Sequence, residues 1–563
     1  MEKSGESIQC PKCDRLIARD TLQKNLQVCP HCAWHFHLVA RDRIQLLADD
    51  GKFKEIGKRL SAADPLEFDI VRPYRQRLRE AERKTGLIEA ALAGEASLDG
   101  RGVVLICIDF EFMGGTMGSV VGEKVVRAFE WATKKQLPVI LIIASGGARL
   151  QEGMLALMQM AKTTVAVTAY QSVGLPFISV LTNPSFGGPM ASFASLGDIL
   201  LAEPGAEIGF AGSRVVLGTI AESIPADARR AENLLEHGLI DMVVHRAKLR
   251  RTLSLLLSLA APAGRSADLP NVKRRYVVKN SLPAATVVSL ARDPQRPRAR
   301  DYIQRLFKGF VELHGDRSYR DDPAIIGGFA VFHGRTVLIV AQPCGMMPFP
   351  EAYRKTRRLM SLAGKFRLPV IAFVDTPGAH PGLEAEYRGT AIAIAECMAA
   401  FARANVPIVS VVIGEGGSGG ALALGIADAV LMQENAIYSV ISPEGAAAIL
   451  LQDATKSSEL SAALKLRAKD LLGLGIIDDI VPEPPGGAHL DPDGAAHLLG
   501  NRLTYHLARV VNIKPRKLVA RRWERFRSMG KFERGWSRMA RSLMERVRPE
   551  SQETKASADV ERK

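Results

Sequence analysis

Four cysteines near the start of the chain are spaced as metal ligands. They form two C-x2-C pairs separated by 15 residues, Cys10 with Cys13 and Cys29 with Cys32. Zn²⁺ prefers four thiolates in a tetrahedron, and each short pair presents two sulfurs to one ion. Two disulfides or a redox pair are the alternatives, but a redox motif would not occur twice. We therefore expect one structural zinc ion in a small ribbon, which either grips nucleic acid or caps another domain.

Two Gly-Gly pairs have the residue types needed to stabilise negative charge. The pairs are Gly187 with Gly188 and Gly419 with Gly420. A helix of small residues is expected after each, over 190–196 and 421–426, and its first N–H groups would point into the turn. One isolated pair would more simply mark a tight turn or close helix packing. Two pairs in a duplicated unit favour two oxyanion sites, which suit transfer between two molecules that each carry a carbonyl group.

An internal repeat must position these turns. The stretch QLPVILIIASGGARLQEG from Gln136 matches RLPVIAFVDTPGAHPGLE from Arg367, and GLPFISVLTNPSFGGPMASFASLGD matches NVPIVSVVIGEGGSGGALALGIAD. Four anchors hold offsets of 230 to 232 residues along the chain. Each copy reads strand, Gly turn, helix, strand, Gly-Gly turn, helix. Apolar strands that alternate with helices predict an α/β fold with parallel βαβ units.

Composition excludes several classes of protein. With 47% apolar residues among 563, the chain can bury several cores, and it has no apolar run of the ~20 residues needed to cross a bilayer. The start, MEKSGESIQC, lacks the apolar core of a secretory signal, so we expect a cytoplasmic protein. Seven cysteines do not make a disulfide scaffold, and P-loop, G-x-S-x-G and H-E-x-x-H motifs are absent. Nucleotide-driven chemistry is not expected.

The net charge of +15 is concentrated near the C-terminus. Residues 514–548 contain 13 basic and 3 acidic residues, a net charge of +10. Aromatic and aliphatic residues recur there at intervals of mostly three to four residues, which predicts a basic amphipathic helix. Such a helix is either a solvated face or a surface for nucleic acid, an anionic membrane or a protein partner.

The motifs resemble those of a known enzyme family. The ribbon, FMGGTMGSVVGEK, ASGGARLQEG, LMQMAKT and IGFAGSRV resemble the β subunit of the bacterial acetyl-CoA carboxylase carboxyltransferase. The second half resembles its α subunit through ELHGDR, EAYRK, VDTPGAHPG, VIGEGGSGGALA and YSVISPEG. The resemblance covers about residues 8–530, with the two subunits fused β before α.

The resemblance implies two crotonase-like (ClpP/crotonase ββα superhelix) domains in tandem after the ribbon. It implies transfer of a carboxyl group from carboxybiotin, on a separate biotin carboxyl carrier protein, to acetyl-CoA, giving malonyl-CoA for fatty acid biosynthesis. Biotin carboxylase would be another chain, and the protein would be a homodimer equivalent to α2β2, in which a site can form between chains.

The resemblance also assigns roles to residues. The two Gly-Gly pairs would be the oxyanion holes. The substrate-binding turn would be Ser145, Gly146, Gly147, Ala148 and Arg149. Arg149 is the candidate for recognising the malonyl carboxylate, and an ion pair that holds the turn together is its alternative. The ureido anion left on biotin could take the α-proton, so no side-chain base is required.

Three departures separate the chain from its relatives. The basic loop before EAYRK is shorter by about ten residues, near Gly345; Pro189 follows the first Gly-Gly pair; and IGFAGSRVVLGT replaces a more usual IGFAGPRVIEQT. Another short acyl-CoA, a biotin-dependent decarboxylase and, from a different class, a zinc-ribbon nucleic-acid-binding protein are therefore retained as alternatives.

The expected domain organisation follows from these motifs. We expect a zinc ribbon at 1–45, a β-type domain at 46–258, a linker with the start of the α-type segment at 259–300, an α-type domain at 301–513 and a basic helical tail at 514–563.

Overall fold

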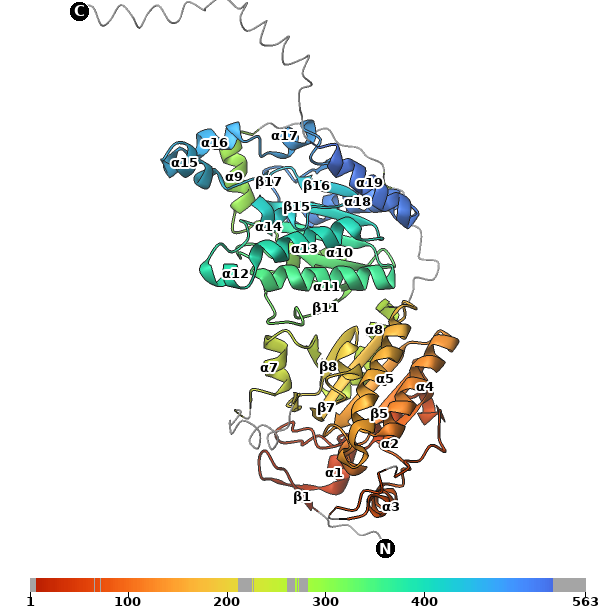
Figure 1. The fold of residues 1–563 in the computed structure, drawn as a ribbon. Coiled ribbons are helices and arrows are strands. Elements are labelled where there is room, and N and C mark those ends of the chain that lie inside the picture. Colours follow the sequence, from red (N-terminus) through yellow and green to blue (C-terminus); the bar gives the residue numbers. More distant parts are fainter. Residues whose placement is uncertain are drawn as a thin grey trace, which may run out of the picture.

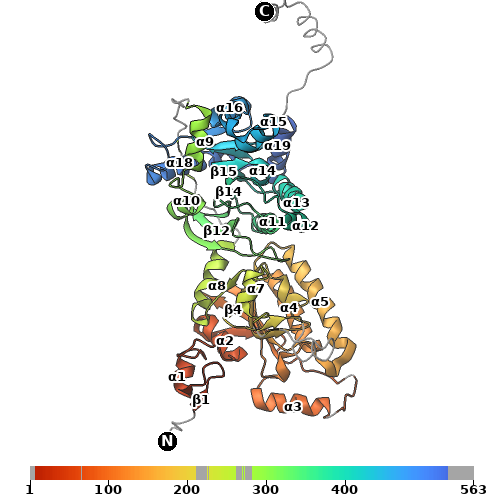
Figure 2. The same ribbon diagram turned by 90° about the vertical axis from the view of Figure 1, so that its left-hand side faces the viewer.

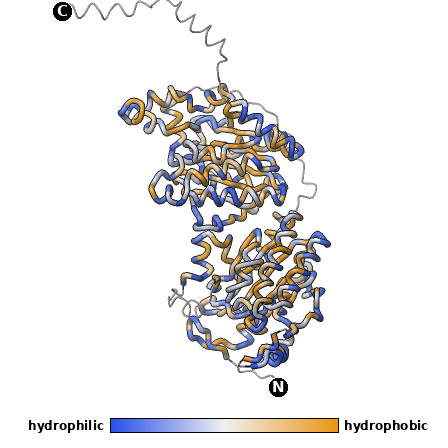
Figure 3. The backbone as a smooth tube through the Cα atoms, viewed as in Figure 1, coloured by the Kyte–Doolittle hydropathy of each residue, from blue (hydrophilic) through white to orange (hydrophobic). Residues whose placement is uncertain are grey.

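The computed structural model describes residues 7–64, 66–70, 72–210, 225, 227–260, 269–270, 272 and 282–529. They form a small N-terminal ribbon and two α/β halves that are stacked end to end, with the ribbon at the far end of the first half (Figures 1 and 2). Hydrophobic residues lie mainly in the interior of each half (Figure 3). Among the described residues, no helix is long and apolar enough to cross a membrane.

Each half is built on a mixed sheet. The first has the order β10-β8-β7-β6-β5-β4-β3, and the second has the order β11-β12-β13-β14-β15-β16-β18. The strands of the first sheet are β3 (Phe53–Glu55), β4 (Ala91–Leu98), β5 (Arg101–Ile108), β6 (Val139–Ser145), β7 (Phe177–Phe186), β8 (Ile199–Ala202), β9 (Ile208–Gly209) and β10 (Met242–Val243). Those of the second are β11 (Lys308–Glu312), β12 (Ile326–Phe332), β13 (Arg335–Ala341), β14 (Val370–Thr376), β15 (Ile408–Gly417), β16 (Ala429–Gln433), β17 (Ile437–Ser439) and β18 (Asp479–Val481). Every residue of β6 and β14 is buried, and both strands pair in parallel with their neighbours, as the continuous apolar runs predict.

Helices connect the parallel strands. The ribbon and first half contain α1 (Arg19–Lys24), α2 (Ala40–Leu47), α3 (Tyr74–Thr85), α4 (Ser119–Lys135), α5 (Gly153–Gln171), α7 (Ala231–Glu236) and α8 (Arg246–Ala260). The second half contains α9 (Ala284–Arg292), α10 (Ala299–Leu306), α11 (Pro350–Phe366), α12 (Leu383–Tyr387), α13 (Thr390–Arg403), α14 (Ser418–Leu422), α15 (Pro443–Leu450), α16 (Ser457–Ala463), α17 (Ala468–Gly473), α18 (Pro492–Val510) and α19 (Pro515–Arg527). Helices α4 and α5 pack together in the first half, as α11 and α13 do in the second (Figure 1).

The repeat is nearly perfect in its central elements. At an offset of 231 residues, α4 coincides with α11, β6 with β14 and β7 with β15 at both ends. The strand register agrees as well, since Val139 pairs with Phe177 in the first sheet and Val370 pairs with Ile408 in the second.

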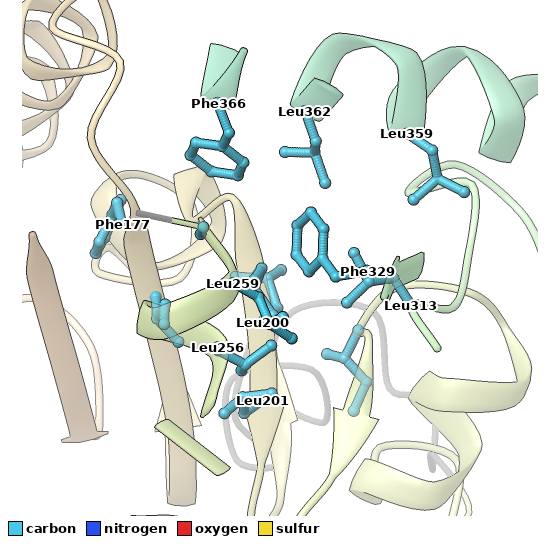
Figure 4. Close-up of a cluster of buried hydrophobic side chains, with 14 of the residues drawn as sticks. Phe177, Leu200, Leu201, Leu256, Leu259, Leu313, Phe329, Leu359, Leu362 and Phe366 are labelled. Carbon is cyan, nitrogen blue, oxygen red and sulfur yellow. The ribbon is translucent and has the colours of Figure 1, made fainter. Parts of the chain in front are cut away.

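The two halves share one hydrophobic core. Figure 4 shows Leu362 and Phe366 of α11 above Leu200 and Leu256 of the first half, and all four belong to one buried cluster. Charged contacts also join acids of the first half to basic residues of the second. The halves are therefore held together by a packed interface.

The structure differs from several of the expected element and domain boundaries. The helix expected over 190–196 is a short 3-10 turn at Phe193–Leu196, and the one expected over 421–426 is α14, which ends at Leu422. Helix α9 of the predicted 259–300 segment packs on the second half, and Arg292 and Arg296 of that segment pair with Glu415 and Glu483. Residues 261–268 and 273–281 of that segment, the stretch 211–224 and the tail from 530 lie outside the described residues.

Candidate active site

The four cysteines meet at one point in the ribbon. Their sulfur atoms all lie within 4.8 Å of one another, with Cys10 and Cys32 3.6 Å apart and Cys13 and Cys29 3.8 Å apart. A tetrahedral zinc ion with Zn–S bonds of about 2.3 Å places sulfurs at about this spacing. The donor set is all thiolate and leaves no open ligand position, so zinc holds the ribbon together.

The ribbon is docked on the first half by buried charges. Arg246 donates to the ribbon carbonyls of Leu26 and Phe36, and it pairs with Glu203, which Arg43 also holds. Burial alone would raise the pKa of Glu203, but the two guanidinium groups outweigh it and hold that pKa well below the usual value. Of the two roles expected for the ribbon, the contacts support that of a cap.

The first predicted turn closes against the first Gly-Gly pair. The Ser145 hydroxyl donates to the Gly115 carbonyl and accepts from the Gly147 N–H. Gly147 has φ +122° and Gly187 has φ +73°, and a Cβ added at Gly187 would lie 2.6 Å from Gly147 Cα. Only glycine allows this approach of two backbones. The fold thus brings together two sequence segments that were predicted separately.

The first pair offers one backbone donor rather than two. The Gly187 N–H donates to the Phe210 carbonyl at 2.9 Å, so it is not available to a ligand. Among the described residues, no acceptor faces the Gly188 N–H. Of the two predicted donors, only Gly188 therefore has an N–H that no acceptor in the described part of the chain engages. Pro189 lacks an N–H, and its carbonyl instead accepts from residues of the following turn.

The second pair is open on one side and packed on the other. A Cβ at Gly419 would meet nothing within 4 Å, whereas one at Gly420 would lie 2.5 Å from the Ala379 N atom. Both lie in the first turn of α14, where N–H groups have no partner within the helix, and no acceptor for either is found among the described residues. Gln342 donates to the Gly420 carbonyl at 2.9 Å and fixes the turn.

The strand register shows which residues of the two turns correspond. Ser145 pairs with Ser185 and Thr376 with Gly416, which sets the offset at 231. Gly188 therefore corresponds to Gly419 rather than to Gly420, and the residue that matches Gly187 is Ser418. Ser418 has φ +52°, a left-handed conformation that costs a non-glycine residue energy.

Arg149 is fully buried and has no donor left for a substrate. Its five N–H groups are directed at the carboxylate of Glu89, the hydroxyl of Tyr74, and the hydroxyl and carbonyl of Thr116. Burial lowers the pKa of Arg149, but the Glu89 carboxylate outweighs this effect and raises it. These contacts favour the alternative role of Arg149 over recognition of a malonyl carboxylate. In that alternative, the ion pair with Glu89 holds the turn together.

Two buried polar residues near the second turn were not predicted as site residues. The Tyr353 hydroxyl would lie 3.0 Å from a Cβ at Gly420, and no hydrogen-bond partner for it is present in the described part of the chain. Burial raises the pKa of Tyr353 far above its usual value, so it is a neutral phenol. Gln342 is the other. Only the motif EAYRK pointed to Tyr353, and nothing in the sequence distinguished Gln342.

The shortened loop borders the second turn. The Thr376 hydroxyl donates to the Met346 carbonyl, and the His380 N–H donates to the Pro348 carbonyl. The His380 ring stacks on Phe349 with centroids 4.1 Å apart. His380 therefore packs against this loop.

A cavity of about 630 Å³ lies next to the first turn. Met190 and Ala191 line one part of it, and Arg317 and Arg358 of the second half line another. Its volume is within the range of small-molecule sites.

Comparisons with known proteins agree with this architecture. The family profile described as acetyl-CoA carboxylase zinc finger domain matches residues 8–32, and the profile described as acetyl co-enzyme A carboxylase carboxyltransferase-like matches residues 271–530. A protein of Saccharopolyspora erythraea, named acetyl-coenzyme A carboxylase carboxyl transferase subunits beta/alpha, is 44% identical and covers 93% of this chain and 94% of its own length. One of Clostridium tetani with the same name is 41% identical over 93% of each chain.

Solved structures show the same fold at low identity. Transcarboxylase 12S, with methylmalonyl-coenzyme A and methylmalonic acid bound, superposes with a TM-score of 0.68 at 23% identity, covering 85% of this chain and 91% of its own. A single-chain, multi-domain long-chain acyl-CoA carboxylase gives a TM-score of 0.64 at 20% identity, covering 82% of this chain and 45% of its own. The expected fold, two crotonase-like α/β domains in tandem behind a four-cysteine zinc ribbon, is confirmed.

Proposed function

Because the chain belongs to the family of acetyl-coenzyme A carboxylase carboxyl transferase subunits beta/alpha, we propose that its two Gly turns are the oxyanion sites of carboxyl transfer. The protein is an enzyme that transfers a carboxyl group from biotin to acetyl-CoA to give malonyl-CoA, a step of fatty acid biosynthesis. Biotin arrives on a separate carrier protein and supplies the carboxyl group. We place biotin carboxylase on a further chain and the enzyme in the cytoplasm.

One observation carries the assignment of the site. Equivalent positions of the two repeats, Gly188 and Gly419, each hold a backbone N–H without an acceptor among the described residues, and Gly420 adds another beside Gly419. Negative charge develops on two carbonyl oxygens in this reaction, the thioester oxygen of the acyl-CoA and the ureido oxygen of biotin. N–H groups that are already oriented stabilise such charge without reorganisation.

The turns themselves need support from buried groups. Arg149 and Glu89 fix the first turn from behind, and Gln342 fixes the second through the Gly420 carbonyl. These side chains act through the backbone and do not touch the reacting atoms. Their role is to hold the N–H groups at hydrogen-bonding distance from the developing oxyanions.

We further propose that each complete site forms between two chains. The turns follow the carboxyl ends of β6, β7, β14 and β15, whereas acids at the amino ends of β7 and β8 make the junction within the chain. Figure 1 shows β7 and α14 in different halves, on either side of that junction. Apolar side chains beside the turns remain exposed on α5 and α13, including Met154 and Ile392 at 63% and 67%. A homodimer that packs α5 against α13 of its partner covers these residues and places a first turn opposite a second.

The catalytic assignment is tested by decarboxylation of malonyl-CoA with biotin methyl ester as acceptor. Gly419→Val fills the open side of the second turn and is expected to lower kcat/KM at least 100-fold, by analogy with loss of an oxyanion donor. Gly473→Val is the matched control, because a Cβ there also meets nothing within 4 Å but lies in α17, away from both turns. Equal activity of the two variants contradicts the assignment. Acetyl-derived and propionyl-derived substrates are compared in the same assay.

The arrangement between chains is tested by complementation. Gly188→Val and Gly419→Val each disable one turn, and together they leave one intact pair of turns in a mixed dimer. Co-expression of the two variants is then expected to restore roughly a quarter of wild-type activity, because half of randomly paired dimers carry one working site of two. Activity that stays at the level of the single variants contradicts a site between chains.

A further inference from the structure

The amino ends of the two sheets carry acids at matching places. Asp198 accepts from the N–H of Phe177, the first residue of β7, and Asp428 accepts from the N–H of Ile408, the first residue of β15. Each acid therefore caps the start of the strand that ends at the Gly-Gly turn of its repeat.

A second acid accepts from the neighbouring strand in both repeats. Asp241 accepts from the Leu200 N–H of β8, and Asp478 accepts from the Val430 N–H of β16. The first repeat thus presents Asp198 and Asp241 at the amino end of its sheet, which we call the acidic edge. The second repeat presents Asp428 and Asp478 at the corresponding end.

In the first repeat this edge is covered by the second repeat. Lys365 of α11 donates to both oxygens of Asp198 at 2.6 Å, and Arg358 of the same helix bonds Asp241 at 3.1 Å. Arg317 also pairs with Asp241. The acidic edge is therefore the docking surface through which one repeat accepts the next.

In the second repeat helix α19 covers the same edge. Arg522 bonds Asp428 through Nη2 at 2.7 Å and Nε at 3.1 Å, and Arg525 pairs with Asp478. Arg522 is fully buried and also donates to the carbonyls of Phe401 and Ala404 at the end of α13. Two arginines of one short helix thus occupy the places that Lys365 and Arg358 occupy at the junction.

We propose that α19 is an end cap that keeps the second repeat from accepting another copy of the chain. The competing surface is α4, which coincides with α11 at an offset of 231. Arg127 and Lys134 of α4 then correspond to Arg358 and Lys365, and both are exposed, with Arg127 paired only to Glu123 of its own helix among the described residues. Without α19, α4 of one molecule can dock on the acidic edge of the next. This contact joins different surfaces and therefore extends into open chains.

The test compares three lengths of the chain by sedimentation velocity over a range of concentrations. A chain that ends at Met529 loses only the residues after the cap, and one that ends at Lys514 loses α19 as well. The first is expected to match the full chain. The second is expected to form species of two or more times the starting mass, in proportions that rise with concentration and fall at high salt.

Charge reversal identifies the surface that docks. In the chain that ends at Lys514, Arg127→Glu with Lys134→Glu is expected to weaken the association at least tenfold. A full-length Arg525→Glu variant, which places two like charges together at Asp478, is expected to associate in the same way and avoids truncation. An unchanged mass distribution in both the shortened and the Arg525→Glu proteins overturns the proposal, and so does aggregation that the α4 reversal does not reduce.

Discussion

Replacing Arg149 with methionine separates a residue that holds the first turn from one that binds substrate. The side chains of Arg149 and Glu89 are both fully buried, at 2.6 Å from each other. Methionine fills similar volume but leaves the Glu89 carboxylate with the Ala90 N–H as its remaining close donor. Removing one partner of a buried pair costs about 3–5 kcal/mol, because the other charge stays buried.

This loss translates into a measurable shift. For a half of this size, 1 kcal/mol lowers the melting temperature by roughly 2–4 °C, so Arg149→Met is expected to melt roughly 6–20 °C below wild type. Adding Glu89→Gln removes the unpaired buried charge. The double variant is expected to regain part of the lost free energy of unfolding, on the order of 1–3 kcal/mol. Thermal unfolding of the single and double variants measures both effects.

Kinetics distinguish the two roles. With a displaced turn, kcat for malonyl-CoA decarboxylation is expected to fall in the folded enzyme while KM changes less than threefold. A variant that melts within about 1 °C of wild type but raises KM at least tenfold would refute the positioning role and restore Arg149 as a carboxylate ligand.

Three further outcomes follow from the ribbon and the second turn. Zinc chelation is expected to unfold the ribbon, because structural zinc supplies on the order of 10 kcal/mol of folding free energy; Trp34 fluorescence and released zinc should change together, and zinc loss without a change at Trp34 contradicts this. Because the pKa of Glu203 is lowered in the folded protein, its carboxylate contributes stability. This contribution is complete above the unfolded pKa near 4.5 and is lost as pH falls through the lower folded pKa. The free energy of unfolding should therefore fall less steeply below pH 4.5 in Glu203→Gln than in wild type, and parallel curves contradict the assignment. Ser418→Val is expected to cost about 1–2 kcal/mol at its positive φ, whereas Ser418→Gly should be tolerated in thermal unfolding.

Patterns that depend on spacing were sufficient to predict the scaffold. The two C-x2-C pairs predicted the ribbon, since thiolate geometry fixes the distance between ligands and little else contributes. The internal repeat predicted two halves of equal construction, because apolar runs at matching offsets have to form equivalent buried strands. Neither inference needs the position of any side chain in detail.

Aligning the two repeats by identical residues placed the Gly-Gly pairs one residue out of register. Gly187 and Gly419 have the same side chain, but Gly187 shares its left-handed φ with Ser418. The strand register, which the sequence does not display, determines which residues correspond. The role of Arg149 was open for a related reason, since its partner Glu89 lies 60 residues away in the chain and no local pattern connects them.

Comparison of the repeats shows which buried polar residues the fold itself requires. Asp198 and Asp428 both cap the first N–H of a strand, and the hydroxyls of Ser145 and Thr376 both accept from the N–H two residues later. The partner in each case is backbone, which has the same course in both repeats. A polar side chain is therefore kept at each of these places, because the exposed N–H group recurs wherever the strand and turn recur.

Side chains that pair with other side chains follow a different rule. At the offset of 231, Arg149 corresponds to His380, and the guanidinium with its Glu89 partner is replaced by a ring stacked on Phe349. Both arrangements support a turn of the same backbone shape, yet one uses a buried ion pair and the other an aromatic contact. A pair can change as long as both members change, since only an unmatched buried charge is costly. The residues that hold a turn from behind are thus the least predictable part of this site, whereas the glycines and hydroxyls bonded to backbone are the most predictable.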